Sequence, residues 1–538
     1  MISPIARDFA ISSRQIVTMN ASREVLDGYL VVRAGTITDV LPRGSELSAT
    51  MPVMNLDDKV LLPGFVDPHM HFSTTAAALW GAVDCHAPHC ESISDIQAAL
   101  RDNAHLRDTR GGWLVGQSGL FTEQKLKDRR LPNRNDLDLV STEFPIVIRF
   151  GGHVTAVNTA ALELGIDAGL PTSGDAYMEL DSSGSPTGIL HEMFYSLPIP
   201  SIPENDFDDA IDQMVQDNIT RYGTTTIGEM FASAGELEAI AARSVAGRIP
   251  LRIEAFLRIA DAQPQDIQSA RAIEFSETDE FRLRGIKIFI DGGFSAQGAA
   301  ILGEYRASRD GQPNQGRIGY SRGRLTGLVR ACGDNEFQLA AHVNGERAQV
   351  LLCEAAAAAR EGAAGYTPVR LEHAGNLLTS PATMESWRSA EATPIPQATF
   401  LWTMGESIEE SIELEGPEAL FPFRTLFENG WDISSSSDGT GSEPRQFNSL
   451  FGVEIAVTRA SWSGRSLSPD QAVSRMDALA MHTINAAKAM GLEDRVGSLE
   501  VGKHADFLVA ADSPLRVAPA DISHIEVEEV FLGGVPVK

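Results

Sequence analysis

The strongest constraint on the fold is a repeated alternation of short apolar segments with helix-like stretches between residues 61 and 438. Each apolar segment has the length of a buried strand, and helix-like stretches such as Gln349–Arg360 separate them. The strand candidates are residues 61–71, Thr224–Met230, Leu251–Arg258, Leu283–Asp291, Phe337–His342, Val369–His373, Thr393–Gln397 and Asp432–Asp438. Alternation implies a parallel sheet, and eight such units fit a closed barrel. We therefore predict an α/β fold with a TIM-like (β/α)8 barrel at residues 61–496.

The two ends of the chain differ from this pattern. Short strands with turns fill residues 9–60, and similar strands occur at Asp506–Ala510 and Ile525–Leu532. Because chain ends often lie close together, residues 1–60 and 497–538 are expected to form one small β-sandwich domain. A long insertion at residues 73–210 follows the first barrel strand and is expected to lie over the active-site mouth.

The first barrel strand ends in Asp67-Pro68-His69-Met70-His71. In an extended chain, residues i and i+2 point to the same face, so His69 and His71 project together. Two neutral imidazoles side by side suit a transition metal such as zinc. By itself the pair is a weak signal, because two strand-end histidines without a metal would look the same.

Four further residues strengthen the metal interpretation. His342, His373 and Asp438 end predicted strands, and Lys287 lies within one. In a barrel the carboxyl ends of the strands converge, so these side chains are expected to meet His69 and His71.

Lys287 lies among apolar residues in the predicted strand Leu283–Asp291. Period two places its isoleucine neighbours toward the outer helices and Lys287 toward the barrel interior. Burial lowers the pKa of an ammonium group, and the neutral amine can add carbon dioxide to give a carbamate that bridges two metals. The alternative is an ion pair between Lys287 and Asp291 without chemistry.

Several motifs occur in one order along the chain: HMH at a strand end, IKIFIDGG, HVNGERA, RLEHAG and SSDG. In this order they resemble the amidohydrolase superfamily, as does the C-terminal stretch HTINAAKAMGLEDRVGSLEVGKHADFLVA. The motifs DGGFSAQGAA and GGHVTAVNTAAL narrow the resemblance to the amidohydrolase-3 branch, which includes N-substituted formamide deformylases. The resemblance covers about residues 10–538.

This resemblance implies a metal-dependent hydrolase that cleaves a C–N bond in an amide or N-acyl compound. His69, His71 and Asp438 would hold one metal. His342 and His373 would hold a second, with carboxylated Lys287 as the bridge. A hydroxide between two zinc ions would be the nucleophile, and Asp438 would act as general base and then acid. A single metal, or iron, cobalt or manganese in place of zinc, is compatible with the same ligands.

His153 follows a predicted strand and two glycines, and in the matching branch motif this histidine lies near the substrate. We expect a hydrogen bond from His153 to the substrate or the oxyanion, with a capping role as the alternative. Apolar pocket candidates, each also compatible with plain core packing, are Trp80, Trp113, Phe121, Phe294 and Trp402.

The loop from Cys85 to Cys90 holds two cysteines and two histidines. A second metal site there is conceivable, but the spacing matches no common structural zinc pattern. An ordinary loop of the insertion is the favoured interpretation.

Two other functions fit the same fold. One is a deaminase of an amino-heterocycle, and the other is a non-catalytic regulatory or binding role. Deaminases of this superfamily generally lack the bridging lysine and carry HxxE after the fifth strand. Here His342 is followed by Val343-Asn344-Gly345-Glu346, which is one residue too long. An intact ligand set, including Lys287 and Asp438, argues against a purely binding role.

The composition limits which partners and which cellular compartment are expected. Lys and Arg number 44 against 73 Asp and Glu, a formal charge of −29, which disfavours nucleic acid and anionic membranes as partners. Four scattered cysteines fit a reducing compartment, and we see neither a signal peptide nor a membrane span. We therefore expect a cytoplasmic enzyme with a small-molecule amide substrate, and a homodimer by analogy with the family.

Overall fold

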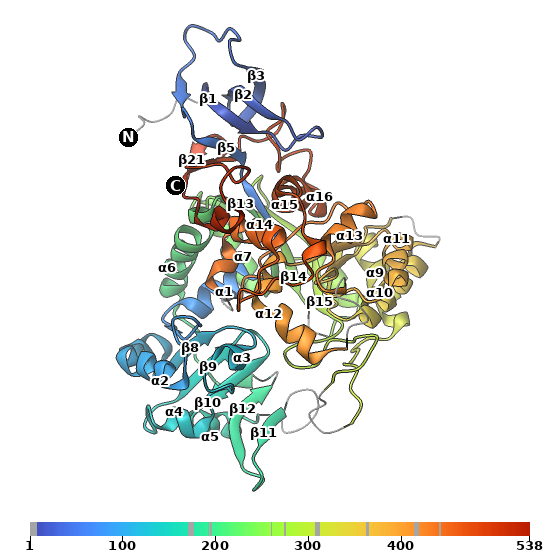
Figure 1. The fold of residues 1–538 in the computed structure, drawn as a ribbon. Coiled ribbons are helices and arrows are strands. Elements are labelled where there is room, and N and C mark those ends of the chain that lie inside the picture. Colours follow the sequence, from blue (N-terminus) through green and yellow to red (C-terminus); the bar gives the residue numbers. More distant parts are fainter. Residues whose placement is uncertain are drawn as a thin grey trace.

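The computed structural model describes residues 8–170, 177–191, 193, 196–259, 261–273, 276–306, 312–361, 365–413, 419–440 and 443–538. Parts of the predicted segments 1–60 and 73–210 lie outside this range. Three bodies are visible in Figure 1: a sheet from both chain ends at the top, the barrel in the middle, and the insertion at the bottom.

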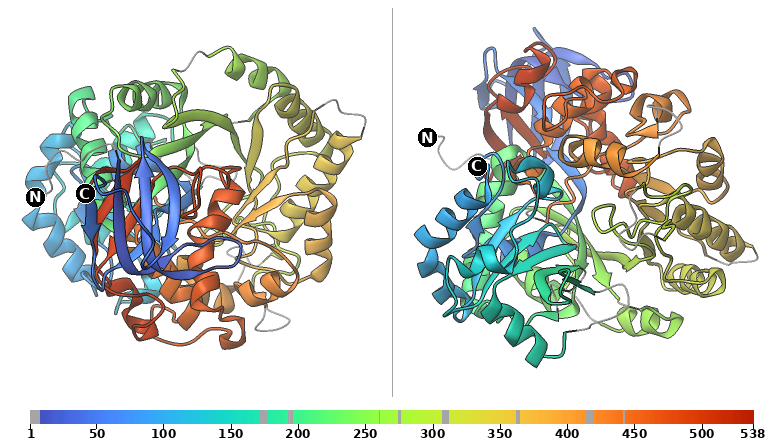
Figure 2. Two further views of the ribbon diagram at one scale, coloured as in Figure 1. Left: turned by 90° about the horizontal axis from the view of Figure 1, so that it is seen from above. Right: turned by 60° about the horizontal axis from the view of Figure 1, so that its bottom comes forward.

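The barrel sheet has seven parallel strands in the order β18-β17-β16-β15-β14-β13-β6. These strands are β6 (Phe65–Met70), β13 (Thr224–Ala232), β14 (Arg252–Arg258), β15 (Phe281–Phe289), β16 (Gln338–His342), β17 (Arg370–Glu372) and β18 (Thr393–Ile395). The helices that follow them are α7 (Ala234–Val245), α8 (Pro264–Arg271), α9 (Arg322–Asp334), α10 (Glu346–Arg360), α11 (Pro381–Ser389) and α12 (Ala398–Ser411). In the left view of Figure 2, the yellow and orange helices lie outside the strands, as alternation of strand and helix requires.

The predicted eighth strand, Asp432–Asp438, is not a strand in the structure. The segment nevertheless lies between β6 and the end of β18, because the Asp438 amide donates to His69 O at 2.9 Å and the Ser436 amide donates to Pro396 O at 3.2 Å. Side chains also accept from this segment, since the Ser437 amide donates to an Asp67 carboxylate oxygen at 3.1 Å. Bonds of this kind close the barrel without a regular ladder, and the predicted fold class is confirmed.

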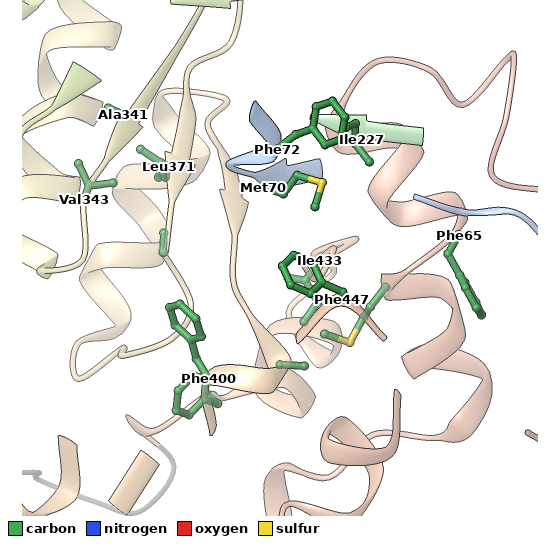
Figure 3. Packing of buried hydrophobic residues seen from close by; sticks show 14 of the residues in the cluster. Phe65, Met70, Phe72, Ile227, Ala341, Val343, Leu371, Phe400, Ile433 and Phe447 are labelled. Atoms are coloured by element: carbon green, nitrogen blue, oxygen red, sulfur yellow. The ribbon is translucent and has the colours of Figure 1, made fainter. Parts of the chain in front are cut away.

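Alternation along the strands separates the two faces of the barrel. Leu339 and Ala341 of β16 belong to the main core cluster, together with residues of the covering helices such as Leu325. Ala340 lies between them in sequence and packs instead with Met230 and Phe256 in a small cluster of its own. Residues of alternate parity therefore face the helices and the barrel interior. Figure 3 shows part of the main cluster, with Ile227 beside Phe72, and with Ala341, Val343 and Leu371 together.

Beyond α12, the chain completes the barrel layer with further helices. They are α13 (Phe423–Glu428), α14 (Ser449–Thr458), α15 (Arg475–Met481) and α16 (Ile484–Ala489). Near the first strand, α1 (Phe72–Leu79) packs against α6 (Glu204–Met214). In sequence, α1 precedes the strands of the insertion and α6 follows them. None of the helices in the described ranges combines the length and apolar character needed to cross a bilayer.

The insertion forms a sheet of its own, with six strands in the order β11-β12-β10-β9-β8-β7. Their bounds are β7 (Val83–Asp84), β8 (Leu114–Ser118), β9 (Ile146–Phe150), β10 (Val154–Val157), β11 (Tyr177–Leu180) and β12 (Pro186–His191). The accompanying helices are α2 (Ile93–Asp102), α3 (Thr122–Lys125), α4 (Arg134–Asp138) and α5 (Thr159–Asp167). Along β9, Ile146 and Ile148 pack in one core cluster while Val147 packs in another, so this sheet is buried on both faces.

Both chain ends join one mixed sheet of eight strands, with the order β21-β20-β19-β5-β1-β2-β3 and β4 beside β1. Their bounds are β1 (Asp8–Val17), β2 (Val25–Arg33), β3 (Thr36–Pro42), β4 (Val53–Asn55), β5 (Val60–Pro63), β19 (Phe507–Ala510), β20 (Val527–Leu532) and β21 (Val535–Pro536). The expected pairing of the two ends is therefore present, while the division of the chain into domains stays a prediction.

The apolar run that was expected to form one strand before His69 is divided at Gly64. Its first part is β5 of the terminal sheet and its second part is β6 of the barrel. A Cβ atom at Gly64 would lie 2.3 Å from the Thr225 hydroxyl, so only glycine permits this close crossing between the two sheets.

Candidate metal centre

The four histidines predicted at strand ends lie together at one end of the barrel. His69 lies in β6 and His71 directly follows it, His342 ends β16, and His373 follows β17. The ring centroids of His69 and His71 are 5.3 Å apart, those of His69 and His373 are 5.2 Å apart, and those of His342 and His373 are 4.5 Å apart. Residues up to about 300 positions apart in sequence thus share one small volume, as the convergence of barrel strands requires.

His69, His71 and Asp438 form the tightest group. The Asp438 Oδ1 atom lies 3.3 Å from His69 Nε2 and 3.1 Å from His71 Nε2. Within the described residues, these three are the group of histidine, cysteine or acidic side chains whose ligand atoms all lie within 4.8 Å of one another. Two imidazoles and a carboxylate in this arrangement make a common transition-metal site.

Lys287 is completely buried in β15. Burial lowers the pKa of its ammonium group to about 8, while the nearby Glu372 and Asp438 carboxylates act in the opposite direction. The ion pair between Lys287 and Asp291 is absent from the structure, because the Asp291 carboxylate instead accepts hydrogen bonds from the amides of Ala300, Asn344 and Gly345 at 2.7–3.0 Å. Lys287 is therefore a buried amine whose neutral form is accessible near neutral pH.

Three of the histidines have their Nδ1 atom held by the protein. His69 Nδ1 lies 2.6 Å from a Glu372 carboxylate oxygen, His71 Nδ1 lies 2.7 Å from Met230 O, and His373 Nδ1 lies 2.9 Å from Gln397 Oε1. These partners are acceptors, so each Nδ1 carries the proton and each Nε2 keeps its lone pair. Orientation of this kind is typical of metal-binding histidines.

His342 differs from the other three, because its Nε2 atom is the one in contact with the protein. The Asn344 side-chain nitrogen lies 2.9 Å from it and also donates to Gly292 O at 3.1 Å. The ring of Phe289 stacks on the His342 ring with a centroid distance of 4.7 Å, which fixes the plane of the imidazole.

Two of the candidate ligands have a left-handed backbone. The φ angles of His373 and Asp438 are 74° and 46°. Neither residue is a glycine, and such conformations are costly and concentrate at functional sites. With strict alternation, the His373 side chain would point to the face opposite that of Glu372, whose carboxylate contacts His69. The left-handed backbone at His373 instead brings its ring to the same side as Glu372 and His69.

Burial keeps the imidazoles of His69, His342 and His373 neutral, and the Asp438 carboxylate is ionised. Burial, supported by the Lys287 charge, lowers the pKa of His69 to about 3. Burial likewise lowers the pKa values of His342 and His373. Burial would raise the pKa of Asp438, but the facing imidazoles of His69, His71 and His373 outweigh it and hold that pKa well below its ordinary value. Neutral imidazoles and an ionised carboxylate are the protonation states that bind a divalent cation.

Three buried polar atoms at this site have no hydrogen-bond partner. They are His69 Nε2, Asp438 Oδ1 and Lys287 Nζ. Buried polar atoms without partners are rare and call for an explanation. A divalent cation next to His69 and Asp438 satisfies the first two atoms, so the residues present fit a metal.

The site opens into a cavity of about 1400 Å³. Its barrel wall includes Phe231, Phe289 and Phe400, and a second wall comes from the insertion together with described residues of the segment after β15. His153 is part of that second wall, and its ring centroid is 6.2 Å from that of His342. Residues of the insertion therefore line part of this cavity, while its placement over the active-site mouth stays a prediction.

The five apolar pocket candidates from the sequence do not line this cavity. Trp113 and Phe294 are buried in core clusters, and Phe121 borders a separate, smaller cavity. Trp402 packs against Phe451. Plain packing, the alternative considered for each of them, describes the positions of Trp113, Phe294 and Trp402.

Sequence patterns missed the residues that support the ligands. Glu372 and Gln397 hold histidine rings, and Asp67 accepts from the amides of His69 and Ser437 at 3.2 and 3.1 Å. The sequence did contain a signal for them, since each is a polar residue in a barrel segment that carries a candidate ligand or neighbours one that does. Period two alone does not tell which of these polar residues contacts which ring.

The loop from Cys85 to Cys90 shows no metal-binding geometry in the described residues. Burial raises the pKa of the Cys85 thiol well above its ordinary value and that of Cys90 to about 11. His86 lies with Nδ1 2.7 Å from the Asp84 carboxylate. Protonated thiols are poor metal ligands, and the favoured interpretation as an ordinary loop agrees with the structure.

Known proteins with the same architecture support this assignment of the fold. A metal-dependent hydrolase of Pyrococcus horikoshii matches 95% of this chain and 99% of its own with a TM-score of 0.72, at 20% sequence identity. Among sequences, N-substituted formamide deformylase of Arthrobacter pascens is 28% identical and aligns over 98% of both chains. Protein LONG AFTER FAR-RED 3 of Arabidopsis thaliana is 24% identical over 98% of this chain and 91% of its own.

The sequence profile of the amidohydrolase family matches residues 52–538, which is most of the chain. That range contains the barrel, the insertion and every candidate ligand described above. The chain therefore belongs to the amidohydrolase family, whose enzymes hydrolyse C–N bonds.

Proposed function

We propose that this enzyme is a metal-dependent hydrolase of a small amide or N-acyl compound. His69, His71 and Asp438 hold one metal, and His342 and His373 hold a second, with carboxylated Lys287 between them. Two zinc ions are the proposed cofactor, because imidazole and carboxylate ligands suit zinc. The observation that carries the proposal is the group of His69, His71 and Asp438, beside which the His373 and His342 rings lie and where three buried polar atoms have no hydrogen-bond partner.

Zinc bound at this point would lower the pKa of a water molecule toward neutrality and polarise the carbonyl of the scissile bond. The remaining work falls to the protein. Asp438 is ionised because its pKa lies well below the ordinary value, and the carboxylate oxygen that does not bind metal can accept the proton of the attacking water. The same oxygen then delivers that proton to the leaving nitrogen, as a general base followed by a general acid.

Lys287 supplies the bridge by forming a bond from its neutral Nζ to the carbon of carbon dioxide, with loss of one proton. Burial favours this step by lowering the amine pKa to about 8. His153 is placed in the wall that faces His342, where its ring can donate to the substrate carbonyl oxygen. The apolar rings of Phe231, Phe289 and Phe400 exclude bulk water from one side of the cavity.

The same geometry disfavours a deaminase. Glu346, the acidic residue nearest the HxxE position, accepts hydrogen bonds from the Thr379 and Ser380 amides at 2.9 and 3.0 Å and from the Thr383 hydroxyl at 2.8 Å. It therefore anchors the loop after β17 and is occupied there.

The test is metal analysis of the purified protein combined with a screen of N-formyl, N-acyl and aryl amides. We expect bound divalent metal, hydrolysis of at least one amide class, and loss of both in His71→Ala. His89→Ala is the matched control, because His89 is exposed on the Cys85–Cys90 loop. A protein that binds no divalent metal, or that releases ammonia from an amino-heterocycle while no amide is cleaved, would contradict the proposal. The cytoplasmic location and the homodimer stay predictions.

A further inference from the structure

A buried ion pair lies inside the barrel beneath the metal site. Arg370 and Glu372 of β17 are both completely buried, and Arg370 Nε donates to Glu372 Oε1 at 2.7 Å. Taking two charges out of water is expensive, and a buried ion pair is weak evidence of stability. Its remaining contacts therefore deserve a functional explanation.

Those contacts converge on the strand end that carries His69. The other Glu372 oxygen lies 2.6 Å from His69 Nδ1, and Arg370 Nη2 donates to Pro68 O at 2.7 Å. The pair thus holds both the ring of His69 and the backbone immediately before it. Because β17 and β6 are not neighbours in the sheet, these bonds cross the barrel interior.

The support of His69 differs in charge from that of the other ligands. His71 and His373 have neutral acceptors, a backbone carbonyl and the amide oxygen of Gln397. Among the four candidate histidines, His69 is the one held through Nδ1 by a carboxylate. A carboxylate accepts only, so it fixes the Nδ1–H tautomer, and its charge makes Nε2 a stronger electron donor.

We propose that Arg370 and Glu372 are positioning residues for His69. Glu372 directs Nε2 of His69 toward the metal. Arg370 bonds to both Glu372 and the Pro68 carbonyl, so it holds the His69 ring in a fixed position relative to its own strand. The inference rests on the metal site of the proposed function. It predicts that the metal affinity of the site formed by His69, His71 and Asp438 depends on this pair.

The first test uses Glu372→Gln in the full-length protein stripped of metal. The dissociation constant for zinc is measured by competition with a chromophoric chelator. We expect the affinity to fall by about 10–100-fold, since partners of metal-bound histidines contribute by this amount. Glu254→Gln is the matched control, because Glu254 is also a buried glutamate on a barrel strand and makes no contact with the ligands. Its zinc affinity should equal that of the wild type.

Glu372→Gln leaves the Arg370 charge buried and unpaired, which can unfold the protein. The double variant Arg370→Met/Glu372→Met removes both charges at similar volume, a change that is often neutral for stability. It should fold by circular dichroism and show the same loss of zinc affinity or more. Equal zinc affinity in the folded double variant and the wild type would overturn the inference.

A second measurement separates this inference from the proposed function. Nitrogen NMR of labelled histidines in the metal-free protein reports the tautomer of His69, with His69→Gln identifying the signal. We expect an Nδ1–H signal in the wild type that is shifted or lost in the double variant. If the wild type binds no zinc but this change occurs, the proposed function fails and the positioning of the ring stands. An unchanged His69 signal would refute the positioning role.

Discussion

Two parts of this enzyme carry residues that commonly bind metals, and only one of them forms a site. The Cys85–Cys90 loop gathers cysteine and histidine within six consecutive residues. The barrel rim gathers its candidate ligands from β6, from the ends of β16 and β17, and from the closing segment. Ligand atoms within 4.8 Å of one another occur at the rim, and none of the described loop residues belongs to such a group.

The difference lies in what surrounds each cluster. In the loop, Cys85 and Cys90 are buried in an apolar core, and burial raises both thiol pKa values. At the rim, hydrogen-bond acceptors behind the rings of His69, His71 and His373 leave Nε2 free of a proton. Proximity in sequence is therefore a poorer guide to a metal site than convergence of strands with a supporting layer of acceptors.

The largest effect is expected from Asp438, one of two aspartates that each lie beside a histidine. Asp438→Asn should reduce kcat by about 100–10,000-fold while the protein stays folded, because the variant loses the group that accepts and returns the proton. Asp84→Asn, at the Asp84–His86 contact of the loop, should leave kcat unchanged. Steady-state kinetics on the best amide substrate checks both. Comparable kcat values in Asp438→Asn and the wild type would remove the distinction between the two clusters.

Removal of metal should lower the thermal stability of the protein through the rim and not through the loop. A cation that binds only the folded state adds about 2.7 kcal/mol at a concentration 100 times its dissociation constant. Thermal unfolding with and without a chelator should therefore show a lower Tm for the stripped protein. The double variant Cys85→Ala/Cys90→Ala should keep the full difference in Tm, and a smaller difference would place a metal in the loop.

A smaller effect is expected from the loop thiols themselves. Cys85 is completely buried, so Cys85→Ala should lower the free energy of unfolding by about 1 kcal/mol, as is typical for loss of a small buried side chain. Denaturant titration measures this change. Zinc content should be unaffected, in contrast to the rim variants, and a loss of zinc in Cys85→Ala would join the loop to the metal centre.

The last effect concerns pH dependence and a buried carboxyl group that belongs to neither cluster. Burial raises the pKa of Glu254 to about 7 from the usual value near 4.5. Between these values the folded protein binds a proton that the unfolded chain does not, so the free energy of unfolding falls as pH rises. Glu254→Gln should make that dependence flatter between about pH 4.5 and pH 7. Denaturant midpoints at several pH values test this, and parallel curves for variant and wild type would contradict it.

Much of the fold and of the rim was predictable from particular residues. The apolar segments predicted the barrel, and their polar last residues predicted where His69, His342 and His373 would lie. The supporting layer was not predictable, since Glu372 and Gln397 reach histidines on other segments. Phe231, which lines the cavity, has a φ of 79°. Its left-handed backbone was not predictable, because the residue is not a glycine.

The sequence by itself determined the alternation of strand and helix, the amidohydrolase motifs, and the identity of the residues that can bind metal. The tertiary structure decided which of these residues meet, and which atom of each imidazole is free. It also closed the barrel through Asp432–Asp438, a segment that forms isolated hydrogen bonds in place of a regular strand. The physical reason is that periodicity fixes the face on which a side chain lies, whereas partners from distant segments and left-handed backbone at His373 and Asp438 fix its final direction.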